Sequence, residues 1–290
     1  MPVRLPDEQP GPARARLLVV VAVPAEADAV LRGLGGLGAA AERVPLPGGA
    51  LDRVALPCGA TVDVLAGGVG PGAAAAAAAT ALTAARYDLV VSAGIAGGFA
   101  PRAPIGATVL ATGIVAADLG AETPEGFADV TELGFGTVRH TPAPAAVALA
   151  AEALRAAGAG PVATGTVLTV STVTGSAGRA AALTARHPDA VAEAMEGFGV
   201  AEAADRHGVP AFELRTVSNP VGPRDRTAWR IGEALGALER AFAALPYPAL
   251  ALALAATGSP TSEPAASEPP HSHRAEPPGP RRAPKEAGRG

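Results

Sequence analysis

The chain has 290 residues, 49% of them hydrophobic, which is enough to bury the core of one large domain. Its net charge of −4 and its 3% of aromatic residues argue against a nucleic-acid partner, because basic surfaces and stacking platforms bind such partners. Cys58 is the single cysteine, which excludes an internal disulfide and argues against a structural zinc site. A single cysteine is also typical of a protein in a reducing compartment such as the cytoplasm.

The first predicted elements follow an extension, residues 1–15, whose proline- and arginine-rich composition predicts disorder. The apolar run 17–23 could be the core of a signal peptide or a buried strand. We favour the strand, because the run is short and leads directly into a predicted helix at 25–34. Pro24 suits the first position of that helix, so Glu26 falls in its first turn. No apolar run approaches the roughly 20 residues that a membrane span needs.

Strands and helices then alternate along the chain, which is typical of an α/β domain. A long polar loop at 115–140 interrupts this alternation, and it could be a lid or could reach a neighbouring subunit. Buried strands are predicted at 51–56, 61–66, 87–92, 107–116 and 162–170, helices at 73–86, 144–157, 176–186 and 227–245, and glycine-rich turns at 67–72 and 94–98. The short apolar run 249–256 is expected to extend the last helix or to pack on the surface.

The segment 192–219 carries the most informative pattern. We predict a helix in its first half, since apolar residues recur at helical spacing until Gly208, and a buried strand in its second half. Two polar residues are out of place in these apolar elements: Glu196 inside the helix and Asn219 at the end of the strand. Ligands of open α/β sheets bind beyond the carboxyl ends of strands, so we expect these two side chains to share a site.

Together the elements predict a single three-layer α/β/α domain over residues 16–248, with a mixed, largely parallel central sheet. The tail, 257–290, is rich in proline, serine and arginine. It cannot bury enough apolar surface to fold, so we predict disorder and assign it no function.

Three segments that end at one predicted edge of the sheet carry a family resemblance: VAVPAEAD (21–28), SAGIAGGF (92–99) and MEGFGVAEAA…ELRTVSN (195–219). In this order they resemble the nucleoside phosphorylase and nucleosidase superfamily, and the resemblance extends over about residues 17–245. The motifs are most similar to its hydrolytic branch, which includes methylthioadenosine/S-adenosylhomocysteine nucleosidase. Within that branch, VPAEAD and SNPVGPRDRTAWRI (218–231) resemble the futalosine hydrolases of menaquinone biosynthesis. The resemblance implies a nucleoside phosphorylase-like fold, a homodimer, and hydrolysis without a metal or an organic cofactor.

The resemblance places water activation and ribose binding on two carboxylates. Glu26 matches the glutamate that holds and deprotonates the attacking water, although the helix dipole also favours an acid in a first helical turn. Met195 and Glu196 match a pair in which the methionine packs on the ribose and the carboxylate accepts from both hydroxyls. The alternative is that Met195 is an ordinary core residue and Glu196 is a solvated helix residue. The apolar neighbours of Glu196 disfavour its solvation. Arg215 matches an arginine near the same water, and a buried arginine there needs a partner such as Glu26 or Glu196.

The glycine-rich loop implies that water, rather than phosphate, is the nucleophile. In the superfamily this loop, here Ile95, Ala96 and Gly97, lines the ribose and the water. Phosphorylases carry cationic residues there and in the first loop, whereas neither VPAEAD nor SAGIAGG contains Arg or Lys. Ile95 departs from the serine that adenine-specific nucleosidases carry, which removes one hydroxyl near the water.

Asn219 is predicted to read the base. Adenine-specific relatives have Asp at this position, whereas an amide presents a donor and an acceptor that suit the O6 and N7–H of a 6-oxopurine. We therefore expect hypoxanthine as the leaving base and discrimination against adenine. A simple turn at Asn219-Pro220 is the alternative. Thr172 and Val173 match the segment that brackets the purine, and Phe198, Phe99 or another ring could replace the stacking aromatic residue that is missing there.

Three further residues could bind the aryl carboxylate of futalosine: Arg224, Arg226 and Trp229. An arginine with an aromatic ring suits this group, although the same residues could be surface charges at a helix start. The predicted reaction is hydrolysis of futalosine to hypoxanthine and dehypoxanthinylfutalosine. The alternatives are a methylthioadenosine-type nucleosidase, a 6-oxopurine nucleoside phosphorylase, and a nucleoside-binding protein without turnover.

Overall fold

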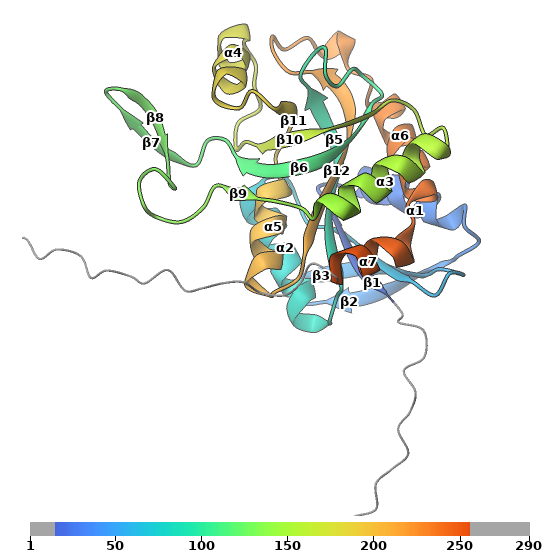
Figure 1. The fold of residues 1–290 in the computed structure, drawn as a ribbon. Helices are drawn as coiled ribbons and strands as arrows, with labels where there is room; N and C mark the ends of the chain where they lie inside the picture. The colour runs from blue at the N-terminus through green and yellow to red at the C-terminus, as the bar shows by residue number, and fades with distance from the viewer. Residues whose placement is uncertain (1–14, 256–290) are drawn as a thin grey trace, which may run out of the picture. The chain divides into compact units, whose positions relative to one another are not determined.

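A ten-stranded mixed sheet organises the protein, whose computed structural model describes residues 15–255 (Figure 1). Its strands are β1 (Arg16–Val21), β2 (Ala41–Leu46), β3 (Gly49–Ala55), β4 (Thr61–Ala66), β5 (Leu89–Gly98), β6 (Thr108–Ala116), β9 (Arg139–His140), β10 (Val162–Thr169), β11 (Ala190–Ala194) and β12 (Ala211–Pro220). A separate hairpin pairs β7 (Gly120–Thr123) with β8 (Gly126–Asp129). The helices are α1 (Pro24–Gly35), α2 (Pro71–Ala84), α3 (Pro144–Ala156), α4 (Ala177–Arg186), α5 (Gly197–Arg206), the 3₁₀ turn η1 (Arg226–Ala228), α6 (Ile231–Ala244) and α7 (Tyr247–Ala255). No described helix is both long and apolar enough to cross a bilayer.

Strand β1 explains why the central strands are continuous apolar runs. It pairs in parallel with β4 on one side and with β5 on the other. Leu17 and Val19 belong to a core formed with α1, α3, α6 and α7, whereas Leu18 and Val20 belong to a second core formed with α2 and α5. Helices therefore cover both faces of this strand, so both sets of alternating side chains must be apolar.

The other half of the sheet closes into a ring. The strand order is β11-β10-β6-β12-β5-β1-β4-β3-β2, β9 pairs with β6 outside this order, and β11 also pairs with β5. Within the described sheet, five strand pairings are parallel and five are antiparallel. The mixed α/β sheet is thus confirmed, but the expectation that the central sheet is largely parallel is not. The end of β5 provides the reason: Gly97 and Gly98 have no side chains, so Glu193 and Ala192 of β11 can pair with them from the opposite direction.

The predicted helix start at residue 192 is wrong. Residues 190–194 form β11, and α5 begins only at Gly197, so Glu196 lies at the helix N-cap rather than within the helix. All five residues of β11 are buried, and pairing with β10 and β5 outweighs the helix propensity of Ala and Glu. For the same reason β5 continues through the predicted glycine loop at 94–98.

The remaining differences concern shorter segments. β2 is not among the predicted strands, and the predicted loop 115–140 contains the hairpin β7–β8, which projects from the body (Figure 1). The apolar run near 249–256 forms a helix of its own, α7, which packs on α3. The predicted disordered extension and tail lie outside the described residues, apart from Ala15.

Candidate active site

A cavity of about 240 Å³ lies at the carboxyl ends of β5, β11 and β12, beside the first turn of α1. This is the sheet edge at which α/β proteins bind ligands. The three motifs that were far apart in the sequence meet there. Nine of the predicted site residues line the cavity: Glu26, Ile95, Ala96, Gly97, Val173, Met195, Glu196, Asn219 and Trp229.

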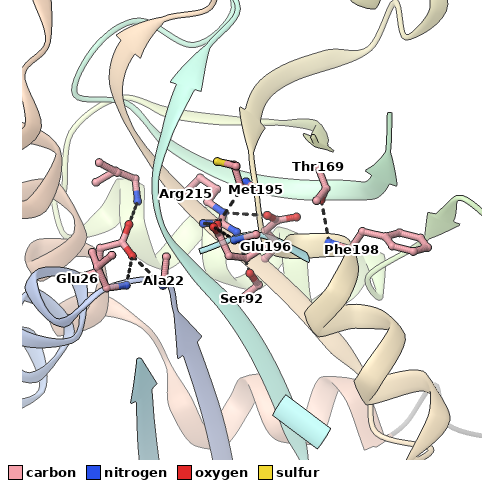
Figure 2. Close-up of polar contacts among 12 residues, drawn as sticks. Ala22, Glu26, Ser92, Thr169, Met195, Glu196, Phe198 and Arg215 are labelled. Carbon is pink, nitrogen blue, oxygen red and sulfur yellow. Dashed lines mark hydrogen bonds and ion pairs between the residues drawn. The ribbon is translucent and has the colours of Figure 1, made fainter. Parts of the chain in front are cut away.

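Glu26 is held by three backbone N–H groups. Its Oε2 accepts from Ala22 at 2.9 Å and from Val23 at 3.3 Å, and its Oε1 accepts from Ile95 at 2.8 Å (Figure 2). Only 4% of the residue is exposed. Burial raises the pKa of the Glu26 carboxyl above its ordinary value, against the lowering effects of the Ile95 N–H and the charge of Arg215. The carboxylate thus combines a fixed position with increased basicity, as a general base requires.

Gly94 allows Glu26 and Arg215 to approach each other across β5. Its φ of +149° is a conformation that side chains disfavour. A Cβ at this position would lie 2.5 Å from Glu26 Oε1 and 3.0 Å from Arg215 Nη1. Only glycine satisfies both the backbone conformation and the space that these two charged groups leave.

Arg215 is fully buried behind the cavity wall rather than lining the cavity. Its Nε donates to Glu213 Oε1 at 2.8 Å, its Nη1 to Glu196 Oε2 at 3.2 Å and its Nη2 to Ser92 Oγ at 2.9 Å. Burial alone would lower the pKa of Arg215, but the charges of Glu213, Glu196 and Glu26 raise it. The guanidinium is therefore a fixed positive charge beneath the cavity. Of its two expected partners, Glu196 bonds to it and Glu26 acts on it only through its charge, and Glu213 is a bonded partner that the sequence analysis missed.

Glu196 faces the cavity from the junction of β11 and α5. Besides Arg215, its Oε2 accepts from the Met195 N–H at 3.3 Å, and its Oε1 accepts from the Gly70 N–H at 3.2 Å. Gly70 has a φ of +93° and belongs to the glycine turn before α2. The sequence analysis recognised this turn but not its function as a backbone donor to Glu196.

Asn219 lines the cavity from the end of β12. Its Nδ2 donates to the Pro220 carbonyl at 3.0 Å, and its Oδ1 accepts from Ser218 Oγ at 2.8 Å. The register of β12 against β5 shifts between Val217 and Asn219, so Ser218 is an extra residue in the strand. Such a bulge re-aims the following side chain, here that of Asn219.

Two predicted purine contacts do not lie in the cavity. The Phe198 ring packs on His140, with ring centroids 5.1 Å apart, and Figure 2 shows it directed away from Glu196. The reason is the late start of α5, which directs Phe198 toward β9. Thr172 is exposed and does not line the cavity, unlike its neighbour Val173.

The predicted aryl-carboxylate residues are only partly brought together. A small hollow beside the cavity is lined by Arg224 and Trp229, and it shares four lining residues with the cavity: Val173, Thr174, Asn219 and Trp229. The Arg224 guanidinium carbon lies 5.6 Å from the centre of the Trp229 ring. Arg226 belongs to η1 and lines neither space.

Glu193 is a cavity carboxylate that the sequence analysis missed. It lies in β11, is 5% exposed, and accepts from the Thr174 N–H at 2.8 Å and from the Thr174 hydroxyl. Burial raises the pKa of the Glu193 carboxyl, against the lowering effect of the bonds from Thr174. The sequence analysis missed Glu193 because it predicted a helix there, on which a glutamate can be solvated. In a buried strand, a glutamate needs a hydrogen-bonding partner or a ligand, which would have made it a candidate site residue.

Comparison with known proteins assigns the chain to a family. A family model described as "Phosphorylase superfamily" matches residues 16–250. The chain is 62% identical over 234 residues to a futalosine hydrolase of Streptomyces coelicolor, which covers 79% of this chain and 94% of that protein. It is 50% identical over 228 residues to a futalosine hydrolase of Acidothermus cellulolyticus, which covers 79% of this chain and 89% of that protein. The chain belongs to the phosphorylase superfamily, in its futalosine hydrolase family.

The fold of this family member also resembles solved structures. The native structure of a Helicobacter pylori futalosine hydrolase matches with a TM-score of 0.65 at 18% identity, over 83% of this chain and 97% of that chain. At such low identity the likeness concerns the fold, and it confirms the expected nucleoside phosphorylase-like architecture.

Proposed function

We propose that this protein hydrolyses the N-ribosidic bond of futalosine and releases hypoxanthine and dehypoxanthinylfutalosine, a step of menaquinone biosynthesis. The observation that carries the proposal is the convergence of Glu26, Glu196 and Asn219 on one cavity. Relatives named futalosine hydrolase at 62% and 50% identity support the same substrate.

Glu26 is proposed to activate the attacking water. The water oxygen bonds to C1′ of the ribose and its proton passes to Glu26. The C1′–N bond breaks with its electrons moving onto the purine, which takes up a proton from solvent as it leaves, and Glu26 later releases its proton to solvent. Backbone N–H groups fix the carboxylate but leave lone pairs free for the water. The negative charge of the carboxylate also stabilises the positive charge that develops on the sugar.

Glu196 is proposed to bind the two ribose hydroxyls, with Met195 packing against the sugar. Gly70 and Arg215 hold the carboxylate from behind, so its cavity side remains available. Arg215 is therefore assigned as a positioning residue rather than a substrate contact.

The charges around the cavity support water over phosphate as the nucleophile. Within the described part of the chain, no Lys or Arg lines the cavity. Arg215 lies beneath the wall and is already paired with Glu213 and Glu196. A phosphate ion would instead face the carboxylates of Glu26, Glu193 and Glu196, which would repel it.

The two ends of the substrate are proposed to occupy two adjoining spaces, the cavity and the hollow beside it. Asn219 reads the 6-oxopurine, next to Val173. Arg224 and Trp229 bind the aryl carboxylate, since the hollow that they line opens beside the cavity.

We further propose a cytoplasmic homodimer. Absence of a second cysteine supports a reducing compartment. In the segment 117–141, Phe135 is 81% exposed, and Leu119 and Leu133 are exposed as well. A second copy of the chain would cover this apolar surface.

The decisive experiment identifies the base that purified protein releases from futalosine and from methylthioadenosine, with and without phosphate. We expect hypoxanthine from futalosine at a rate that does not depend on phosphate. Adenine release from methylthioadenosine alone would assign the nucleosidase alternative, and dependence on phosphate would assign the phosphorylase. Ligand binding without turnover would indicate a nucleoside-binding protein.

A further inference from the structure

The cavity contains one carboxylate, Glu193, that the proposed hydrolysis does not use. Thr174 is its hydrogen-bond partner through the N–H to Oε1 and the hydroxyl to Oε2. None of the ion pairs among the described residues includes Glu193. Because each carboxylate oxygen can accept two hydrogen bonds, both oxygens retain the capacity to accept from a ligand. A nearly buried carboxylate without a cation is unfavourable unless such donors approach it.

The sheet register places Glu193 and Asn219 on either side of Gly97. Gly97 is the partner of Glu193 in β11 and of Asn219 in β12. Directly opposed residues of neighbouring strands project to the same face of the sheet, and two strand spacings separate the outer backbones by roughly 10 Å. A Cβ at Gly97 would lie 3.4 Å from Asn219 Nδ2. The same Cβ would lie 2.9 Å from Val221 Cγ2, so an apolar methyl group bounds the cavity between the amide and the carboxylate, and the face of a planar ring can pack against it.

Asn219 alone selects the base only weakly. An amide can pair with the O6 and N7–H of a 6-oxopurine or, after rotation by half a turn, with the amino group and N7 of adenine. This rotation gives up the single exposed hydrogen bond from Asn219 Nδ2 to the Pro220 carbonyl, but the Ser218 hydroxyl does not oppose it. Its oxygen lies 2.8 Å from Asn219 Oδ1 and 3.3 Å from the Ala96 carbonyl, so it can donate to either. Selection needs a second group whose hydrogen-bonding character is fixed, and an ionised carboxylate only accepts.

We propose that Glu193 is the specificity residue for the base and accepts the N1–H of a 6-oxopurine, an inference that rests on the proposed function. N1–H is adjacent to O6, so a base with O6 and N7 on Asn219 presents N1–H to the neighbouring side of the cavity. Adenine carries an unprotonated N1 there, and its lone pair would face the lone pairs of the carboxylate. Glu193 thus favours the 6-oxopurine and opposes the 6-aminopurine in the same contact.

The test is Glu193→Gln, with kcat/KM measured for futalosine and for its 6-amino analogue. Glutamine keeps the volume and both contacts to Thr174, since its carbonyl can accept the N–H and its amide can donate to the hydroxyl oxygen. Its amide can also donate to the N1 of adenine. We expect the ratio of the two kcat/KM values to fall by about tenfold to a hundredfold. The ratio of the hypoxanthine and adenine dissociation constants, measured by titration calorimetry, should change by a similar factor.

Thr174→Val separates base recognition from a purely structural function of Glu193. This variant removes the hydroxyl contact but keeps the carboxylate. We therefore expect it to lower kcat/KM for both substrates by the same factor and to preserve their ratio. If Glu193→Gln also lowers kcat/KM for both substrates by the same factor, Glu193 only orders the loop that contains Thr174, and the inference is overturned. Should Glu193→Gln fail to fold, Glu193→Asp withdraws the acceptor by one methylene and must reduce the ratio as well. A wild-type protein that does not hydrolyse futalosine would refute the proposed function, whereas the two dissociation constants would still test Glu193.

Discussion

Gly197→Ala is the substitution that tests most directly whether the buried charges position the site. Gly197 is the first residue of α5, next to Glu196, and it packs against the side chain of Glu213. A Cβ at this position would lie 2.2 Å and 2.4 Å from the two oxygens of Glu213, about 1 Å inside an ordinary contact. The carboxylate is fully buried and bonded to Arg215 Nε at 2.8 Å, so it cannot move that far without losing the bond.

The expected loss of stability follows from these contacts. Forcing a methyl group into packed space destabilises a protein by about 1–3 kcal/mol. Uncoupling a buried ion pair adds about 3–5 kcal/mol. Alanine is a better helix former than glycine, and this difference stabilises the folded state by at most about 1 kcal/mol. We therefore expect Gly197→Ala to lower the free energy of unfolding by about 3 kcal/mol or more, and to lower kcat/KM because Arg215 no longer holds Glu196.

Urea denaturation and steady-state kinetics would measure both effects. Gly178→Ala is the matched control, because Gly178 lies in the first turn of α4 and a Cβ there meets nothing within 4 Å. It should be neutral or slightly stabilising. In a Glu213→Ala background the clash is absent, so adding Gly197→Ala should have almost no further effect. An equal loss in both backgrounds would refute the assignment of the effect to Glu213.

Three further sets of measurements test the site. Glu26→Gln should lower kcat by about 10²- to 10⁴-fold while calorimetry still detects hypoxanthine binding, and loss of both together would indicate misfolding instead. Because burial raises the pKa of Glu26 in the free enzyme and only its ionised form can accept a proton, log(kcat/KM) should decline as the pH falls, with an apparent pKa above 4.5; an apparent pKa at or below 4.5 would contradict this. Asn219→Asp should shift preference toward 6-aminopurine nucleosides in a substrate panel, and an unchanged preference would exclude Asn219 from base reading. Arg224→Met should raise KM for futalosine but not for a 6-oxopurine nucleoside that lacks the aryl carboxylate, whereas equal changes would remove Arg224 from that contact.

The fold was predictable where strands are buried on both faces. The run around Leu17–Val21 is apolar throughout because two helical layers cover it, and no helical periodicity competes with that pattern. β11 was not predictable from local pattern, because AVAEA favours a helix until β10 and β5 pair with it. Closure of the ring depends on contacts between residues that are far apart in the sequence, and periodicity contains no information on such contacts.

The site was predictable to the extent that function imposes unusual residues on apolar elements. Glu196 and Asn219 stood out as polar residues in apolar elements, whereas Glu26 was assigned from the family resemblance, and all three line the cavity. Glu193 did not stand out, because on a helix it would be an ordinary solvated acid. Phe198 was placed incorrectly for the same reason, since its direction depends on where α5 begins.

Ring closure also determines which part of the described sheet could template aggregation. β11 would otherwise be a terminal strand, but its pairing with β5 removes that open edge. Besides the two-residue strand β9, which pairs only with β6, strand addition is therefore limited to β2 at the opposite end of the order. There Pro45 lacks an N–H, and Glu42 and Arg43 are exposed charges, both of which discourage another chain from docking.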